Sequence, residues 1–342
     1  MFDRVRSRRR RRRRFYSPSV SKAHTRAPSA FLAACLIAAS AAAADSQPQL
    51  LKRINTRGAK PCGSAAYGRY LYVANYGSGT LARLDPKRNR VTKLLRVGDG
   101  PCGVVAGGGA LWVEDYFGSD VARVSPKTFK VTGRVKVHGA PWDVAYGFGS
   151  VWTSNFRDET VSRINPKTLR IVKTIRAGGF PACIRIGDGS VWIGSQGTDA
   201  IYRIDPQTYA VTSTTIGKGG SVCVDVHEDG VWVSNEVDGS VSKVDPATNK
   251  VVGNVEVGPA PADGMRGPDG LEWIPNQGDG TVSLIDPATN KVVGSVHSGG
   301  LTFVVRAGFG SMWVDDFTGT TVSRFQPASA HIDRAIRARY PR

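Results

Sequence analysis

Short apolar runs separated by polar turns fill the chain from residue 51 to about residue 338. Each run is four to eight residues long, is rich in Val, Ile and aromatic residues, and is bounded by Gly, Pro, Asn or Asp. Such runs predict β-strands, and residues 250–257 (Lys-Val-Val-Gly-Asn-Val-Glu-Val) are an example. No stretch in this region keeps a 3.6-residue apolar period over three turns, so the pattern does not predict long helices.

The predicted strands recur in units of fixed length. A proline ends the third strand of each unit, and consecutive prolines are 40 residues apart at every step but one, which is 41. These prolines are Pro86, Pro126, Pro166, Pro206, Pro246, Pro287 and Pro327. An aromatic residue with the same spacing marks the second strand: Tyr72, Trp112, Trp152, Trp192, Trp232, Trp273 and Trp313. Seven four-stranded units of about 40 residues predict an all-β, seven-bladed β-propeller with antiparallel blades, because a ring of such sheets buries faces that one sheet cannot.

Several of the recurring runs resemble YVTN-type propeller repeats. They include residues 71–75 (Leu-Tyr-Val-Ala-Asn), 101–106 (Pro-Cys-Gly-Val-Val-Ala) and 289–293 (Thr-Asn-Lys-Val-Val). The same runs are similar to those of the streptogramin (virginiamycin B) lyase group. The Gly-His and Trp-Asp signatures of WD40 blades are missing, and kelch repeats are nearer 50 residues long. The resemblance covers residue 51 to about residue 338 and implies the fold.

The resemblance does not carry the lyase activity to this chain. Streptogramin lyases use His and Glu on the channel face. One such His directly follows the entry proline, which is the proline that precedes the first, innermost strand of a blade. That level here holds no His and consists of Cys62, Cys102, Trp142, Ala182, Val222, Ala262 and Thr302. The histidines beyond the N-terminal segment, His138, His227, His297 and His331, are expected in loops or outer strands. We therefore expect a non-enzymatic binding or scaffold protein without catalytic residues, its cofactors unknown. The alternative is a lyase or lactone hydrolase that uses channel-face carboxylates and a divalent cation.

Residues 1–44 differ from the repeats and predict an export signal that is removed. An Arg-rich stretch (residues 8–14) precedes an apolar run (residues 30–44), and cleavage after Ala44 leaves residues 45–342 as a single propeller domain. A twin-arginine signal, a lipoprotein signal at Cys35, a basic nucleic-acid arm and a start codon assigned too early are the alternatives. The apolar run is about 15 residues, short for a membrane span, so no transmembrane segment is expected in the mature chain and we expect it in the periplasm or secreted.

Removal of residues 1–44, the leader, would lower the net charge of the protein. The chain has 46 Lys and Arg against 28 Asp and Glu, and the leader holds 11 and 1 of these, so the net charge falls from +18 to +8. Part of the remainder is a ladder on the third strands: Arg83, Arg123, Arg163, Arg203, Lys243 and Arg324. It is expected to be a solvated strand face, and the alternative is a surface interaction protein that binds an anionic polymer or lipid through these basic strands. Nucleic acid is therefore not expected as a partner. We expect a monomer that binds a small anionic ligand or a protein partner.

The four cysteines of the mature chain fall into two pairs. Cys62 and Cys102 are 40 residues apart, as are Cys183 and Cys223, so each pair occupies equivalent positions in neighbouring blades. Innermost strands approach closely near the axis, which predicts two disulfides in an oxidising compartment. Buried free thiols are the alternative. Two pairs with no His at their level argue against zinc, and no metal site is predicted.

The candidate ligand site lies on the innermost strands. Counting back seven residues from each marker aromatic gives one level: Ala65, Val105, Ala145, Arg185, Asp225, Arg266 and Arg306. Buried charge is unfavourable unless it is paired or hydrated, so this level predicts either an anion site, which suits the planar fork of arginine, or ion pairs between Asp225 and its neighbours. Trp142, beside Asp143 at a blade entrance, is a candidate stacking platform or a channel plug.

Polar residues also end the second strands, as at Asn75 and Asp115. They are expected to cap turns, although Glu114, Asp115, Asp315 and Asp316 offer ligands for a cation.

Two segments compete to close the ring. Residues 49–57 resemble the fourth strand of other blades and are predicted to pair in the last blade, which removes a sheet edge, and residues 331–338 are the competing strand.

Overall fold

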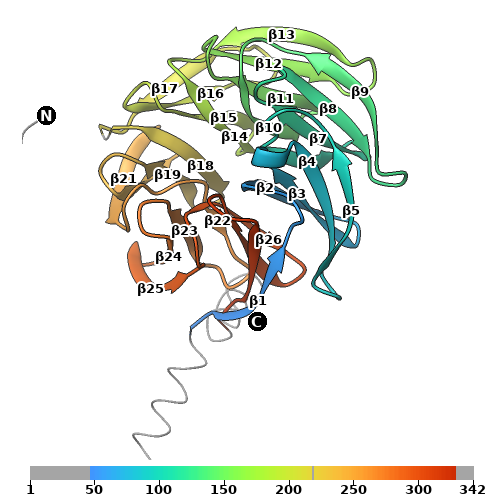
Figure 1. The fold of residues 1–342 in the computed structure, drawn as a ribbon. Helices are drawn as coiled ribbons and strands as arrows, with labels where there is room; N and C mark the ends of the chain where they lie inside the picture. The colour runs from blue at the N-terminus through green and yellow to red at the C-terminus, as the bar shows by residue number, and fades with distance from the viewer. Residues whose placement is uncertain (1–46, 218, 329–342) are drawn as a thin grey trace, which may run out of the picture. The chain divides into compact units, whose positions relative to one another are not determined.

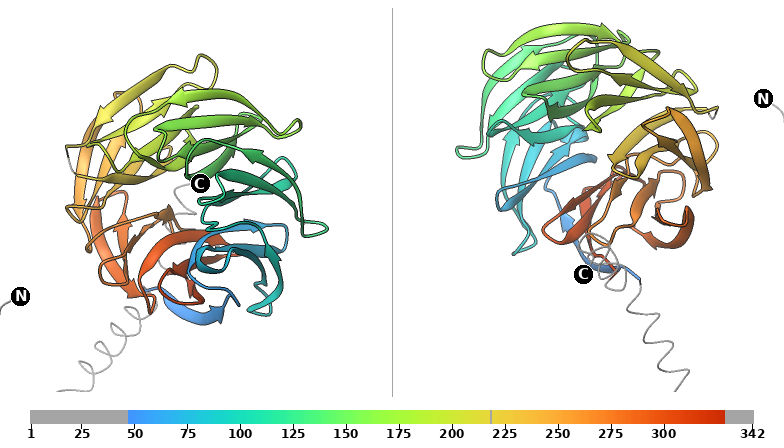
Figure 2. Two further views of the ribbon diagram at one scale, coloured as in Figure 1. Left: turned by 45° about the horizontal axis from the view of Figure 1, so that its top comes forward. Right: turned by 180° about the vertical axis from the view of Figure 1, so that it is seen from behind.

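The computed structural model describes residues 47–217 and 219–328. This part of the chain contains strands β1 to β28 and one 3-10 helix, η1 (Tyr76–Ser78). The strands form four-stranded antiparallel sheets, and the fourth and fifth sheets are joined by a single bridge between Ser195 and Ser221. Figures 1 and 2 show the sheets arranged around a common axis. The seven-bladed propeller predicted from the repeats is confirmed.

Each of the first three blades is formed by four consecutive strands. Blade 1 contains β2 (Pro61–Tyr67), β3 (Tyr70–Asn75), β4 (Thr80–Asp85) and β5 (Arg90–Arg96). Blade 2 contains β6 (Val104–Gly107), β7 (Ala110–Asp115), β8 (Asp120–Ser125) and β9 (Lys130–Lys136). Blade 3 contains β10 (Pro141–Gly147), β11 (Ser150–Asn155), β12 (Thr160–Asn165) and β13 (Arg170–Arg176). The first strand of each is the innermost one.

The remaining blades repeat this order until the last. Blade 4 contains β14 (Pro181–Gly187), β15 (Ser190–Ser195), β16 (Ala200–Ile204) and β17 (Val211–Thr215). Blade 5 contains β18 (Ser221–His227), β19 (Gly230–Asn235), β20 (Ser240–Asp245) and β21 (Lys250–Glu256). Blade 6 contains β22 (Met265–Arg266), β23 (Glu272–Asn276), β24 (Thr281–Asp286) and β25 (Lys291–His297). Blade 7 contains β26 (Thr302–Gly308), β27 (Ser311–Asp316), β28 (Thr321–Gln326) and, from the N-terminal side, β1 (Gln49–Asn55).

The N-terminal strand closes the ring. β1 pairs antiparallel with β28, from Gln49 opposite Gln326 to Asn55 opposite Thr321. In Figure 1 the blue β1 lies beside the red strands of the last sheet. This pairing confirms the prediction for residues 49–57, and it covers the β28 edge that would otherwise be open. The competing segment, residues 331–338, lies outside the described residues.

The hydrophobic core lies between the blades. The marker aromatics of the second strands are almost fully buried, and each packs with residues of a neighbouring blade. Trp112 of blade 2, for example, shares a cluster with Val144, Val151 and Ile164 of blade 3. Its indole nitrogen donates to the Gly107 carbonyl oxygen at 3.1 Å, so its polar atom is satisfied within its own blade. A single blade therefore leaves its aromatic residue without a partner, which explains why the repeat works only in a ring.

The basic ladder of the third strands is not a freely solvated face. Five of its side chains donate to the carbonyl oxygen of a turn proline in a neighbouring blade, at 2.6 to 3.3 Å: Arg123 to Pro166, Arg163 to Pro206, Arg203 to Pro246, Lys243 to Pro287 and Arg324 to Pro86. Four also lie over the marker Trp of their own blade, as Arg163 does over Trp152 at 5.1 Å. These side chains are half-buried links between blades.

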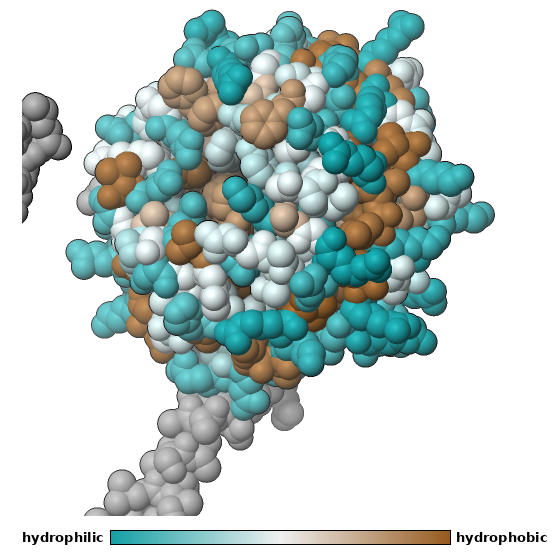
Figure 3. All heavy atoms as spheres, in the orientation of Figure 1, coloured by the Kyte–Doolittle hydropathy of each residue, from teal (hydrophilic) through white to brown (hydrophobic). Residues whose placement is uncertain are grey.

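The outer surface is mixed in character. On the face seen in Figure 3, hydrophobic residues gather in separate patches among hydrophilic ones. Among the residues that the structure describes, no helix has the length and apolar character needed to cross a membrane.

Candidate functional site at the propeller axis

Six of the seven residues predicted at one level of the inner strands are found there. Ala65, Val105, Ala145, Arg185, Asp225 and Arg306 each lie opposite the marker aromatic of their blade. Blade 6 differs, because Met265 lies opposite Trp273, and Arg266 is shifted by one residue to face Glu272. This shift arises because blade 6 belongs to the single 41-residue repeat, and the extra residue of that repeat lies between β22 and β23. A shift of one residue turns a side chain to the other face of a strand, so Arg266 belongs to a different cluster.

The first cluster, the axial network, joins four blades through charge. Arg185 Nη1 donates to Asp143 Oδ2 at 2.6 Å, and both Arg185 and Arg306 donate to the carboxylate of Asp263. The arginine side chains are 14% exposed and that of Asp263 is 5% exposed. Burial alone would raise the pKa of Asp263, but the charges of Arg185 and Arg306 outweigh it and lower that pKa. The network is thus an alternation of two cations and two anions.

Asp263 was missed by the sequence analysis, although a signal was present. It lies two residues after the entry residue Pro261, as Asp143 lies two residues after Pro141. The backbone fixes it in place, because Asp263 N donates to Phe303 O and Asp263 O accepts from Val305 N, both at 3.0 Å. The acidic positions of blades 3 and 6 therefore supply the anions, while blades 4 and 7 supply the cations.

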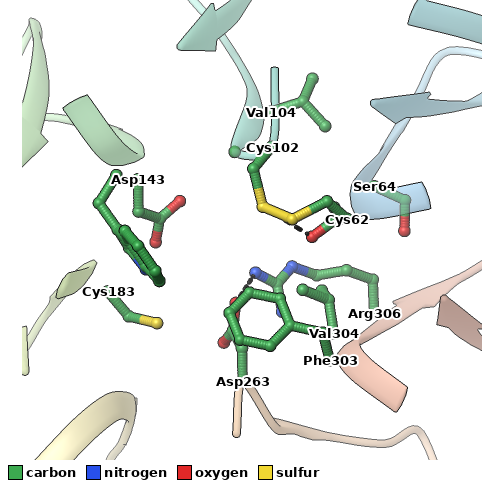
Figure 4. A pocket seen from close by; sticks show the side chains of 13 residues that line it. Cys62, Ser64, Cys102, Val104, Asp143, Cys183, Asp263, Phe303, Val304 and Arg306 are labelled. Carbon is green, nitrogen blue, oxygen red and sulfur yellow. Dashed lines mark hydrogen bonds and ion pairs between the residues drawn. A yellow bond between two sulfur atoms is a disulfide. The ribbon is translucent and has the colours of Figure 1, made fainter. Parts of the chain in front are cut away.

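The space beside the axial network is small. A cavity of about 10 Å³ is lined by Ser64, Asp143, Asp263 and Arg306 together with the aromatic rings of Trp142 and Phe303. Figure 4 shows Arg306 reaching toward Asp263, with Phe303 and the Cys62–Cys102 disulfide nearby. That volume suits one water molecule. A carboxylate or phosphate would reach these guanidinium groups only if a lining side chain moved.

Trp142 lies at this cavity as part of a larger aromatic group. Its ring stacks on Phe156 with 4.9 Å between centroids and meets Tyr116 and Phe303 edge-on at 5.8 and 6.4 Å. It also packs on the Cys183–Cys223 pair. The half-buried ring lines the axial cavity and remains partly exposed, and its roles as a stacking platform or a channel plug stay predictions.

The second cluster lies at the other end of the inner strands. His227 Nε2 lies 2.7 Å from Asp225 Oδ2 and 3.6 Å from Glu272 Oε1, while Arg266 Nε donates to Glu272 Oε1 at 2.6 Å. The expectation that His227 lies in a loop or an outer strand is wrong, because it ends the innermost strand β18. The pairing predicted for Asp225 is with His227 and with the Arg266 backbone N–H at 2.9 Å, while the Arg266 side chain binds Glu272 and Asp229.

Burial and neighbouring charges together shift the pKa values of this second cluster. Burial raises the pKa of Glu272 to about 7, helped by the nearby charge of Asp225 and opposed by Arg266. Burial would lower the pKa of His227, but the hydrogen bond and charge of Asp225 outweigh it, and the pKa is raised. Asp225, His227 and Glu272 offer ligand atoms within 4.8 Å of one another, a possible cation site. The guanidinium of Arg266 on the same carboxylate opposes a second positive charge there.

Both predicted disulfides are formed. Cys62 is bonded to Cys102 and Cys183 to Cys223, each with 4.8 Å between the Cα atoms. The inner strands approach so closely at the first pair that a Cβ on Gly63 would lie 2.4 Å from the Cys102 carbonyl oxygen. Each bond therefore ties neighbouring blades together beside the axis.

The acidic residues considered for a cation mostly have backbone partners. Glu114 Oε1 accepts from the Cys102 and Gly103 N–H groups at 2.7 and 2.6 Å, and Asp115 Oδ1 accepts from Asp99 N at 2.7 Å. Asp315 is different, because it is fully buried and neither carboxyl oxygen has a hydrogen-bond partner among the described residues. Burial raises the pKa of Asp315 to about 8, which leaves the carboxyl largely protonated at neutral pH.

Comparison with solved structures identifies the fold. Virginiamycin B lyase from Staphylococcus aureus superposes with a TM-score of 0.72 over 82% of this chain and 99% of that one, at 12% sequence identity. The chain is similar in fold to virginiamycin B lyase. The WD40 propeller domain of Doa1 (TM-score 0.70, 14% identity, 83% of this chain and 98% of that one) and Kuenenia stuttgartiensis hydrazine synthase (0.71, 14%, 80% and 97%) are also similar. No protein-family model and no curated protein matches the sequence.

The likeness to virginiamycin B lyase extends to the fold alone, because identities of 12 to 14% do not carry an activity. The three neighbours include two enzymes and one WD40 domain, so their fold is compatible with catalysis and with binding. Function must therefore be argued from the residues at the axis and at its mouth.

Proposed function

We propose that the protein is an exported, non-enzymatic β-propeller that acts as a binding or scaffold protein. The observation that carries the proposal is that each arginine at the axis is bound to carboxylates of the chain itself. Groups held in this way link blades and keep the ring rigid, which suits a platform for a ligand. They are poorly placed to exchange protons with a substrate, because each is already bonded.

Two features support export. The Arg-rich stretch and apolar run of residues 1–44 have the order of a signal peptide, and two disulfides are consistent with an oxidising compartment outside the cytoplasm. The test is to express the full chain in a bacterial host, fractionate the cells and determine the N-terminus of the product. We expect a periplasmic or secreted chain that begins at Asp45. A cytoplasmic chain that still begins at Met1 would remove this part of the proposal.

The finer proposal is that the axis takes a small anionic ligand. Arg185 and Arg306 already converge on one carboxylate, that of Asp263, which occupies the place that a ligand carboxylate would take. A ligand would have to displace Asp263 and enter past Trp142 and Phe303, the aromatic side chains that line the cavity. Small carboxylates and phosphate are the anions that the planar guanidinium fork would recognise.

The deciding experiment compares ligand affinity with stability. Calorimetric titration of the wild type with acetate, citrate, sulfate and phosphate is repeated on Arg306→Ala and on Arg266→Ala, the arginine outside the axial network. An axial anion site predicts binding by the wild type and a loss of about tenfold or more for Arg306→Ala. Structural pairing predicts no anion binding and a lower melting temperature for both variants. That second result would leave the scaffold role and remove the anion site.

The alternative, a lyase or lactone hydrolase with a divalent cation, has one observation in its favour. Asp225, His227 and Glu272 are three ligand-type residues within reach of one ion. Titration with Mg²⁺ and Mn²⁺, followed by thermal shift and by turnover of a streptogramin and of a lactone, tests it. Metal-dependent turnover that Glu272→Gln abolishes would replace the binding proposal.

A further inference from the structure

At one end of the propeller axis, here called the mouth, the loops that follow the second strands form an aromatic half and a polar half. The residue directly after the second strand is aromatic in blades 1, 2, 3 and 7 and polar in blades 4, 5 and 6. These residues are Tyr76, Tyr116, Phe156 and Phe317 in the first group and Gln196, Glu236 and Gln277 in the second. On the polar side, Gln196 Nε2 donates to Glu236 Oε2 at 3.2 Å. Equivalent positions of one repeat thus carry opposite chemistry across the mouth.

The aromatic side chains form a continuous group, which we call the aromatic arc: Tyr76, Tyr116, Phe117, Trp142, Phe156, Phe180, Phe303 and Phe317. Neighbouring rings lie 4.9 to 6.4 Å apart between centroids. Phe180 contacts Phe156, which stacks on Trp142. From Trp142 a closed circuit of contacts passes through Tyr116, Phe117, Tyr76, Phe317 and Phe303 and returns to Trp142. Residues from blades 1, 2, 3 and 7 and from the entrance of blade 4 therefore make one surface.

Folding alone does not account for two of these rings. Phe117 is 57% exposed and Phe180 is 44% exposed, so neither gains much from burial. Phe180 also has a φ of 49°, in the left-handed region that bulky residues avoid. The equivalent residues of blades 1, 2, 3, 5 and 6 also have positive φ, and they are small or flexible: Lys60, Gly100, Ala140, Gly220 and Ala260. The turn therefore requires this backbone conformation but not a phenylalanine side chain. Exposed apolar surface of this kind marks interaction sites, and aromatic side chains are the usual anchors of protein interfaces.

Positive charge borders the arc. Lys60 Nζ lies 5.9 Å from the ring centroid of Phe317, and Arg157 Cζ lies 5.7 Å from that of Tyr116. Arg96 and Lys136 end strands β5 and β9, and their side chains donate to the carbonyl oxygens of Ser78 and Gly118, so both lie against the loops that carry the rings. Lys136 is also paired with Asp120 at 3.3 Å, and exposed Asp99 and Asp158 lie on these loops. Lys60, Arg96 and Arg157 have no carboxylate partner among the described residues, so cations remain in slight excess.

We propose that the aromatic arc docks an acidic polypeptide segment that carries apolar or aromatic side chains. Its side chains would pack on the rings, and its carboxylates would pair with the bordering cations. The inference rests on the proposed binding function and names the class of partner. Phenylalanine, the most exposed ring type here, has no polar group, so it fits apolar side chains better than hydroxyl-covered sugars. The remaining rings are half-buried around the mouth, which does not suit insertion into a membrane.

The test is selection from a random twelve-residue peptide library on the immobilised mature protein, followed by affinity measurement for the synthesised winners. We expect enrichment of Asp and Glu together with Trp, Phe or Leu. Phe117→Ser/Phe180→Ser should weaken binding of these peptides tenfold or more, and Lys60→Glu/Arg157→Glu at least fivefold. Val237→Ser is the matched control, because Val237 occupies the Phe117 position in blade 5 and is 77% exposed. It should bind as the wild type does, and melting curves confirm that every variant is folded.

Four outcomes would overturn the inference: no enrichment, enrichment of basic peptides, affinity that the arc variants leave unchanged, or arc-dependent binding of alginate oligomers or phosphatidylglycerol vesicles in place of peptides. The result can be separated from that of the proposed function. If the selection fails while Arg306-dependent anion binding is observed, only the docking surface is rejected. If the protein binds neither peptide nor anion and a substrate is turned over, the binding function itself is rejected.

Discussion

The guanidinium of Arg324 donates a hydrogen bond of 2.6 Å to the carbonyl oxygen of Pro86, a residue 238 positions away in the sequence. The bond crosses the seam between blade 7 and blade 1, where the ring closes. The same side chain lies over the Trp313 ring at 5.0 Å and donates to Ser311 Oγ and Asn89 Oδ1 at 2.9 Å. One residue of the repeated ladder thus fastens the first blade to the last.

Replacing Arg324 should therefore weaken the whole ring. We expect Arg324→Leu to lower the free energy of unfolding by about 1.5 to 3 kcal/mol, the range for hydrogen bonds to charged groups. The free energy of unfolding of Arg324→Lys should lie between those of the wild type and Arg324→Leu, because an ammonium lacks the planar fork that reaches several acceptors. Urea denaturation measures the change, and Arg170→Leu, an exposed arginine at the start of β13, is the control. Equal losses of unfolding free energy in Arg324→Leu and Arg170→Leu would show that the bond across the seam does not stabilise the ring.

The sequence was sufficient to predict the ring because every repeat carries the same local signals. The proline and aromatic spacings fixed the number of blades, and the equivalence of Cys62 with Cys102 was enough to place two cysteines side by side. The closing strand was predictable as well, since a seven-bladed ring needs a partner for β28 and residues 49–55 have the pattern of a fourth strand.

The axial site was only partly predictable, because its contacts depend on side chains that cross the axis. Arg185 of blade 4 reaches Asp263 of blade 6, and no repeat spacing indicates that pairing. One extra residue in blade 6 also moved Arg266 out of the expected level to face Glu272. The distances between blades and the direction of each side chain decide such contacts, and neither is encoded in the periodic pattern.

The disulfides provide a second prediction. Non-reducing peptide mapping of the protein purified without reductant from an oxidising compartment should join Cys62 to Cys102 and Cys183 to Cys223. Each bond closes a loop of about 40 residues, so Cys62→Ser/Cys102→Ser should reduce the stability of the ring by about 4 kcal/mol in the chain-entropy model. Chemical denaturation measures that loss. Recovery of four alkylated cysteines from unreduced, unfolded protein would contradict the prediction.

The closing strand provides a third. Ile54 is 4% exposed and packs with Leu71, Trp313 and Val322 at the junction of blades 7 and 1. Ile54→Ala should destabilise the fold by about 2 to 5 kcal/mol, the usual result of a large-to-small change in a core. Leu51→Ala on the same strand is the control, since Leu51 is 46% exposed and should lose far less. A full-length protein that tolerates Ile54→Ala as well as Leu51→Ala would mean that β1 does not seal the ring.

The last prediction concerns Asp315 and the dependence of stability on pH. Burial raises its pKa to about 8, whereas an aspartate in the unfolded chain has a pKa of about 3.9. Between these values the folded protein holds a proton that unfolding releases, so this group makes the free energy of unfolding fall as pH rises from about 4 to about 8. Asp315→Asn, which stays neutral, should gain stability over the wild type as pH goes from 5 to 9, and most of that gain should be present by pH 8. Denaturation at pH 5, 7 and 9 measures the difference, with exposed Asp199→Asn as control. A difference that does not change with pH would show that Asp315 is already ionised in the folded ring.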